Sequence, residues 1–466
     1  MERFRKVCVI LFGSLSVLFA LVAIHNHYFL NSSKKYARNA YKWDSTLEDI
    51  AQEQNKLIFF FVSGEEVVSK RILKSLKNNY IYTVLDKQKN PADYTVFNYF
   101  LKRTSKTKKD LACAILTPSL KPIYLSSKSD KRRLEKLLPT LASTWENNQK
   151  LIQNRANAIS NRQVFLAQHH YIANSQMLGL SNEYNADKYN AQLPTAVLTE
   201  NARLIFKRLK NSNTPHLVYK ANVAIKHLKD RFKSEKNYTS KLLIARAIAD
   251  ASFAINPRNI KEVQIIADEI VNFSKNKISH SNIKALELAV LCRAYKIYDN
   301  TQYLNCAEQT AKEIQQSINA TENISAIIPT QQFNVQLISQ TSIASAFDLS
   351  TMANAMCDYF EITREKDAIN TALEIIRKLD SDYTHNGFWT MNSKFSASAK
   401  FARITITKDS TTPSHIGEAY QAISRLKRTL QIPTISPVEQ KIRTITKSFI
   451  PSAEHEHASI KLAEID

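Results

Sequence analysis

Glycine is scarce in this chain. Only five glycines occur among the 466 residues, where an average usage of ~7% would give roughly thirty. Phosphate-binding loops of the Walker and dinucleotide types need clustered glycines, and no such cluster is found. Tight turns between short strands also depend on glycine. The shortage therefore favours a mostly helical chain over a β-sandwich.

Paired cysteines are also lacking. None of the five cysteines lies in a C-x-x-C pair, which argues against a zinc site. Three histidine pairs occur, but the first and the last have no rigid element to fix their geometry; they are His25 with His27, His169 with His170, and His455 with His457. We expect neither a bound metal nor a cofactor.

Long apolar runs are lacking except at the N-terminus. Residues 7–24 carry no charge, and Arg3, Arg5 and Lys6 precede them. Basic residues on this flank tend to stay in the cytoplasm. The pattern predicts a cytoplasmic stretch at 1–6, a transmembrane signal anchor at 7–24 and a juxtamembrane linker at 25–42. The protein would be single-pass, with its bulk periplasmic or extracellular. A cleaved signal peptide is the alternative.

Acidic residues are outnumbered by basic ones. The chain has 64 Lys and Arg against 42 Asp and Glu, a net charge of +22. Such a charge favours anionic surfaces, so the expected partners are the membrane, an anionic envelope polymer or a glycan. No nucleic-acid motif accompanies the charge, and we expect no nucleic acid. Solvated lysine-rich helix faces are the simpler explanation.

The pattern of apolar residues divides the rest of the chain in two. Residues 43–147 read helix, strand, helix, strand, helix, strand, strand, helix, which is the order of a thioredoxin fold; the strands fall at 57–62, 80–85, 111–116 and 121–125. From 157 to 432 helices recur about every twenty residues, which predicts an α/α toroid of helical hairpins. A polar tail follows at 433–466. The fold class is thus α/β plus all-α.

Several segments resemble one known family. LIFFFVSGEE, VLDKQKNPADY and ILTPSLKPIY are similar to segments of the thioredoxin-domain family that includes spermatogenesis-associated protein 20. FDLSTMANAMCDYFEIT and DSTTPSHIGEAYQAISRL resemble parts of its helical half. The resemblance implies a thioredoxin-like domain joined to an (α/α) barrel of the six-hairpin glycosidase and N-acylglucosamine 2-epimerase type.

The chain departs from this family at the redox site. Val67 and Val68 stand where the family's Cys-His-Trp-Cys motif should fall, and dithiol exchange needs two thiols. The sequence therefore predicts a thioredoxin-like domain without redox activity.

The resemblance also carries four residues over to a ligand cavity of the barrel: Asp348, Trp389, Asp409 and Ser414. The carboxylates would accept hydrogen bonds from hydroxyls, and the indole would stack on a sugar ring. Alternatively, Ser414 caps its helix and Asp409 satisfies a loop backbone. No pair among them is spaced to demand acid–base catalysis, so no catalytic residue is assigned.

These observations favour a membrane-anchored, non-catalytic binding or scaffold protein. Its thioredoxin-like domain would be redox-inactive and its barrel would bind a glycan-like ligand. Two alternatives remain open. One is a carbohydrate-active enzyme, an epimerase or a glycoside hydrolase, that uses the barrel. The other is a thiol-redox protein of the cell envelope.

Overall fold

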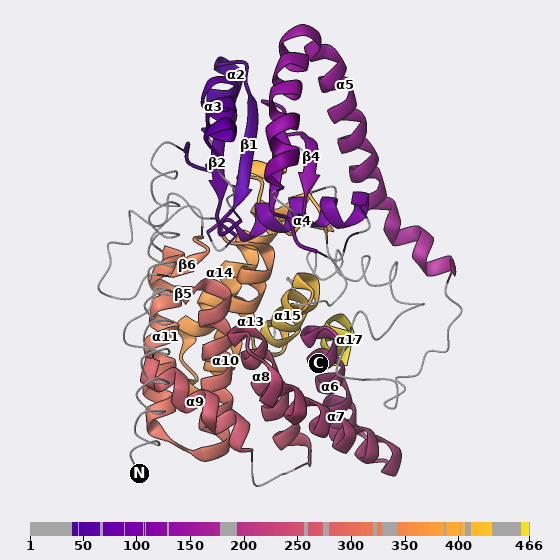
Figure 1. Ribbon diagram of the computed structural model, residues 1–466. Helices are drawn as coiled ribbons and strands as arrows, with labels where there is room; N and C mark the ends of the chain where they lie inside the picture. The colour runs from indigo at the N-terminus through magenta and orange to yellow at the C-terminus, as the bar shows by residue number, and fades with distance from the viewer. Residues whose placement is uncertain are drawn as a thin grey trace, which may run out of the picture. The chain divides into compact units, whose positions relative to one another are not determined.

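The computed structural model describes residues 40–44, 46–65, 69–87, 89–105, 107, 109–127, 130–177, 193–255, 260–273, 279–319, 324–328, 343–385, 388–400, 402–405, 412–430 and 458–465. They form two compact units (Figure 1). The sheet unit comprises Met1–Leu85 and Ser105–Ala156, and the helical unit comprises Asp86–Thr104 and Asn157–Asp466, each as far as it is described.

The sheet unit is built on a four-stranded mixed sheet in the order β2-β1-β3-β4. β1 (Leu57–Val62) and β2 (Tyr80–Leu85) are parallel, and β3 (Cys113–Leu116) is antiparallel to both β1 and β4 (Pro122–Ser126). Every residue of β1 is buried, as expected of a continuous apolar run. The sequence predicts the bounds of β1 and β2 to the residue, because each is a short apolar run flanked by polar residues.

Helices cover this sheet. They are α2 (Leu47–Glu53), α3 (Lys70–Asn79) and the first part of α5 (Lys131–Met177), which bends at Asn148. Leu134 and Leu138 of α5 share one apolar cluster with β1. The Trp145 indole N–H donates to the Asn55 carbonyl oxygen at 2.9 Å, so a polar contact fixes α5 beside the sheet unit's core.

Helix α4 (Pro91–Ser105) lies between β2 and β3 in sequence, yet all but its last residue groups with the helical unit. The Asp93 carboxylate in its first turn accepts a hydrogen bond from the Ser398 backbone N–H at 2.8 Å. The sequence assigned this helix to the domain at 43–147. Its contacts in the helical unit lie three hundred residues away and leave no local signal.

The helical unit is a closed ring of inner helices. Among the described residues these are α6 (Thr195–Asn211), α8 (Tyr238–Ile255), α10 (Ser281–Tyr298), α13 (Ala346–Thr363), α15 (His415–Leu430) and α17 (Ala458–Ile465). Each packs on the next in this order, and α17 packs back on α6 (Figure 1). Such a ring is an α/α toroid, as the sequence predicts.

Outer helices pack on this ring. They are α7 (Pro215–Ser234), α9 (Lys261–Phe273), α11 (Thr301–Asn319) and α14 (Lys366–Tyr383). Two short ladders, β5 (Ser279–His280) with β6 (Ile327–Ile328) and β7 (Thr384–His385) with β8 (Phe388–Trp389), and the 3-10 turn η2 (Ala397–Lys400), complete the unit. The inner helices are buried around most of their circumference, whereas the outer helices bury one face, the division expected of two concentric layers.

The ring is closed by α17, in a part of the chain that the sequence assigns to a polar tail at 433–466. A Cβ added to Gly417 of α15 would lie 2.1 Å from the Ser459 hydroxyl oxygen of α17, so the two helices approach at a distance that only glycine permits. The Gln421 side-chain amide also donates to the Ser459 carbonyl oxygen at 3.1 Å. Eight residues are too few to give a helical period in the sequence.

The expectation of a membrane anchor is corrected here. No helix in the described part of the chain combines the length and the apolar character needed to cross a bilayer. Residues 7–24 lie outside the described residues. The structure therefore does not support an N-terminal transmembrane helix as part of the fold. The predicted single-pass, exported localisation depended on that helix and is not supported either.

Candidate functional site

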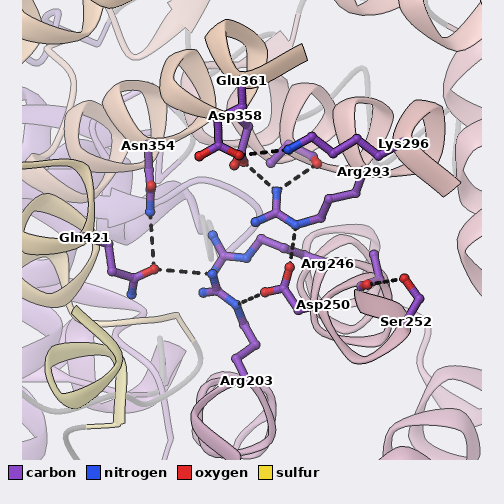
Figure 2. A network of polar contacts seen from close by, with 12 residues as sticks. Arg203, Arg246, Asp250, Ser252, Arg293, Lys296, Asn354, Asp358, Glu361 and Gln421 are labelled. Atoms are coloured by element: carbon purple, nitrogen blue, oxygen red, sulfur yellow. Dashed lines mark hydrogen bonds and ion pairs between the residues drawn. The ribbon is translucent and has the colours of Figure 1, made fainter. Parts of the chain in front are cut away.

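A chain of ion pairs runs around the inside of the ring (Figure 2). Arg203 of α6 donates to the Asp250 carboxylate of α8 at 2.6 Å, and Arg293 of α10 donates to the other oxygen of Asp250 at 2.7 Å. Arg293 also pairs with Asp358 of α13. Asp358 in turn accepts from Arg425 of α15 at 2.7 Å. Charges of alternating sign thus join five successive inner helices.

A second set of ion pairs lies beside the first and is more deeply buried. Arg246 of α8 is 2% exposed, and its guanidinium donates to Glu200 at 2.8 Å and to Glu418 at 2.6 Å. Arg203 donates to the other oxygen of Glu200 at 2.8 Å. The Asn354 amide donates to the second oxygen of Glu418 at 2.8 Å. Both carboxylates therefore have partners for each oxygen, which buried charges require.

The pKa values follow from this pairing. Burial alone would raise the pKa of Asp250, but the guanidinium groups of Arg293 and Arg203 outweigh it and hold that pKa well below its usual range. Burial is likewise outweighed at Glu361, where Arg425 and Lys296 lower the pKa to about 2. The pKa of Glu418 is also lowered, against the effect of burial, by Arg246 and Arg203. These three carboxylates stay ionised at neutral pH.

A hollow of about 480 Å³ opens next to the first set of ion pairs, within the usual range for a small-molecule site. Its walls come from the carboxyl-terminal halves of the inner helices. The lining residues are Arg203, Phe206, Lys207, Lys210, Asp250, Phe253, Ala254, Cys292, Arg293, Lys296, Asp358, Glu361, Gln421, Arg425, Arg428 and Leu462. Phe253, one of these residues, is 42% exposed.

Asp348, predicted from the sequence as a cavity residue, lies at the opposite, amino-terminal end of α13. It is buried and forms a capping box with Ser345: its carboxylate accepts from the Ser345 backbone N–H at 2.6 Å and from the hydroxyl at 2.7 Å. Burial raises the pKa of Asp348 in spite of these hydrogen bonds. Asp348 also accepts a backbone hydrogen bond from Asn282 of α10, so it caps its own helix and contacts the start of a neighbouring one.

Trp389 and Ser414 lie at the same amino-terminal end. Trp389 is 1% exposed and belongs to the apolar core, and its indole N–H donates to Asp380 at 3.1 Å. Ser414 is buried and precedes His415, whose Nε2 lies 3.2 Å from the Trp389 carbonyl oxygen. The structure thus brings Trp389 and Ser414 near each other, but neither lines the hollow.

The remaining predicted positions, Val67, Val68 and Asp409, lie outside the described residues. Within the described part of the chain, no group of three or more metal-binding side chains comes together.

The ion-pair residues were missed by sequence reasoning, although one signal points to them. Charged side chains interrupt helices that are otherwise apolar, as Arg246 and Asp250 do in LLIARAIADASFAI, four residues apart on one face. A charge on the face of a helix buried all round must find a partner on another helix. The identity of that partner is not encoded locally, since the residues of the hydrogen-bonded ion pairs between helices are 43 to 172 residues apart.

No protein-family profile and no curated protein matches the chain. Solved structures with a similar course of the backbone include an inactive variant of the α-1,6-mannanase GH76A of Salegentibacter sp. HEL1_6, 9% identical, TM-score 0.45, covering 65% of this chain and 96% of its own. A D-mannose isomerase is 11% identical, TM-score 0.43, with coverages of 65% and 96%. A possible GH105 member from Salmonella enterica is 8% identical, TM-score 0.44, with coverages of 66% and 93%.

Proposed function

We propose that the helical unit binds a carbohydrate-type ligand in the hollow and does not turn it over there. The pairing of the lining carboxylates carries this proposal. A general acid must keep its proton near neutral pH, whereas Asp250 and Glu361 have lowered pKa values. Both oxygens of Asp250 and of Asp358 are held by guanidinium groups, so neither carboxylate has an oxygen to spare for a proton transfer.

Two features support a carbohydrate over other small molecules. The resemblance described under Sequence analysis implies a barrel of the glycosidase and epimerase type. The hollow also combines exposed hydrogen-bond donors, such as Lys210 and Arg428, with the exposed ring of Phe253 and the side chain of Leu462. Sugars present both hydroxyls and an apolar ring face, and a concave site with a few polar groups among apolar ones suits them.

Calorimetric titration with a panel of mono- and disaccharides tests this proposal. Phe253→Ala should weaken binding by about three- to tenfold, since a ring contact contributes about 0.5–1.5 kcal/mol. Tyr219→Ala is the matched control, because Tyr219 is 57% exposed on α7 and does not line the hollow. Saccharide binding that is equally insensitive to both substitutions would place the ligand elsewhere.

A carbohydrate-active enzyme is the second candidate. The buried groups at the amino-terminal ends favour it. Burial raises the pKa of Asp348 and lowers that of His415 to about 4, and groups with shifted pKa values gather at functional sites. Turnover of an aldose or oligosaccharide, lost in Asp348→Asn while the melting temperature is kept, would support this candidate and place the reaction at the amino-terminal ends of the inner helices.

For the sheet unit we propose a thioredoxin-like module without thiol chemistry. The strand order β2-β1-β3-β4, with β1 and β2 parallel, supports it. Burial raises the pKa of the Cys113 thiol to about 12, and a thiolate is the reactive form in disulfide exchange. We expect no insulin reduction above buffer. Activity abolished by Cys113→Ser would restore the thiol-redox alternative.

A further inference from the structure

The hollow is lined by more cations than the carboxylates of its ion pairs neutralise. The two sets of ion pairs are balanced: five cations (Arg203, Arg246, Arg293, Lys296 and Arg425) face five anions (Glu200, Asp250, Asp358, Glu361 and Glu418). Three lining cations remain, Lys207 and Lys210 of α6 and Arg428 of α15. Lys210 and Arg428 are exposed and have no hydrogen bond or ion pair within the part of the chain that the structure describes.

Basic residues near the carboxyl end of a helix often serve to offset its dipole. In α10 and α13, backbone N–H groups already donate to carbonyls of the last turn. Helices α10 and α13 end in left-handed residues, Asp299 and Arg364, whose backbone N–H groups donate to the carbonyls of Tyr295 at 2.8 Å and Phe360 at 2.9 Å. At α6 the Ser212 N–H donates to the Arg208 carbonyl at 2.9 Å. Lys210 and Arg428 lie in the last turns of α6 and α15, so their charges also offset the dipoles of these two helices.

We infer that the ligand of the hollow is an anionic sugar. Its phosphate or carboxylate group is bound by Lys210 and Arg428, and its ring lies against Phe253. Arginine and lysine both bind such groups through charge-assisted hydrogen bonds. This inference rests on the proposed function for the hollow and adds to it the chemical class of the ligand. Lys210 and Arg428 would bind the anion, since the cations of the ion pairs are already neutralised by carboxylates.

Titration calorimetry with glucose 6-phosphate, glucuronate, glucose and inorganic phosphate tests the inference on the full chain. Glucose 6-phosphate or glucuronate should bind more tightly than glucose, and the difference should shrink as salt is raised. Lys210→Glu/Arg428→Glu should weaken binding of the anionic sugar about tenfold or more, since hydrogen bonds to charged groups contribute about 1.5–3 kcal/mol. Lys427→Glu is the control for Arg428→Glu measured alone, because it makes the same charge change on the adjacent residue of α15, outside the lining.

The outcomes separate this inference from the proposed function. If glucose binds as tightly as its anionic derivatives and the double variant changes neither, the anionic class is wrong while carbohydrate binding stands. If inorganic phosphate alone binds and is lost in the double variant, the cations form an anion site but the carbohydrate proposal fails. If nothing binds and the double variant only alters the melting temperature, the lysine and arginine serve the helix ends, and both proposals fall. Comparing the phosphate and carboxylate sugars identifies the preferred anion.

Discussion

The two ends of the inner ring differ in what their polar residues do. At the amino-terminal ends, Asp348 and His415 are buried and their contacts are local or to backbone. At the carboxyl-terminal ends, Asp250 and Arg293 are partners across helices and border a hollow. Asp348 and His415 begin a helix and anchor a loop, whereas Asp250 and Arg293 link helices to one another. Glu418, in the first turn of α15, also links helices, but it does not line the hollow. Buried polar side chains in such a barrel therefore indicate a binding site only where they also line a hollow.

The largest effect should come from unbalancing the buried charges. Glu418→Gln removes one anion and leaves Arg246 and Arg203 with too few partners, so we expect a loss of about 4 kcal/mol in the free energy of unfolding. Arg246→Met/Glu418→Gln removes one charge of each sign. Since Glu200 remains paired with Arg203 at 2.8 Å, the double variant should lose less than the sum of the single variants. Urea denaturation measures all three.

Additive losses in this double-mutant cycle would mean that Arg246 and Glu418 do not interact, and this ion pair would then contribute nothing to the stability of the ring.

The sequence predicts the four strands of the sheet unit and all the inner helices except α17, but not the contacts between helices. β1 is found because six consecutive apolar residues fill it, and α10 because apolar residues cover most of its circumference. The role of Asp348 as a capping residue is a local pattern, Ser345 with Asp348 three positions later, that the family resemblance obscured. Arg203 has one local partner, Glu200, three residues before it. Its partners on other helices, Asp250 and Gln421, lie 47 and 218 residues away, and no local pattern specifies them.

Two aromatic residues allow the ends to be compared directly. Trp389→Ala at the amino-terminal end empties a core position, and we expect a loss of about 3 kcal/mol in stability. Phe253→Ala in the hollow should cost about 1 kcal/mol or less, because much of its ring is already exposed. Thermal or urea unfolding of the two variants measures the difference. A cost for Trp389→Ala as small as that for Phe253→Ala would mean that the indole is available to a ligand after all.

The two ends should also lose stability in different pH ranges. His415 is buried in the neutral form, with a folded-state pKa of about 4 against 6.5 unfolded. The neutral imidazole contributes fully to the free energy of unfolding above pH 6.5. This contribution, about 2–3 kcal/mol, is lost as the pH falls to 4. Glu361 has a folded-state pKa of about 2 against 4.5, so its contribution is complete above pH 4.5 and is lost towards pH 2.

Urea midpoints measured from pH 8 to pH 2 resolve these two ranges. His415→Gln keeps a side-chain donor for the Trp389 carbonyl but cannot titrate, so the decline between pH 6.5 and 4 should shrink while the decline at lower pH stays. An unchanged decline in the upper range would show that another group titrates there.

The smallest effect concerns the closure of the ring. On an exposed helix, Gly417→Ala would stabilise the chain by up to about 1 kcal/mol, because alanine is the better helix former. In the ring the new Cβ would lie 2.1 Å from the Ser459 hydroxyl oxygen and 2.8 Å from the Ser459 carbonyl carbon. Since a backbone atom is among them, α17 must shift, and overpacking of this kind costs about 1–2 kcal/mol. We therefore expect a net loss of stability in the full chain and a gain in a chain that ends at residue 430. Hydrogen exchange should show faster exchange in α17 of the variant. A gain in both chains would mean that α17 does not close the ring at Gly417, and the side of the hollow to which Leu462 contributes would then be open.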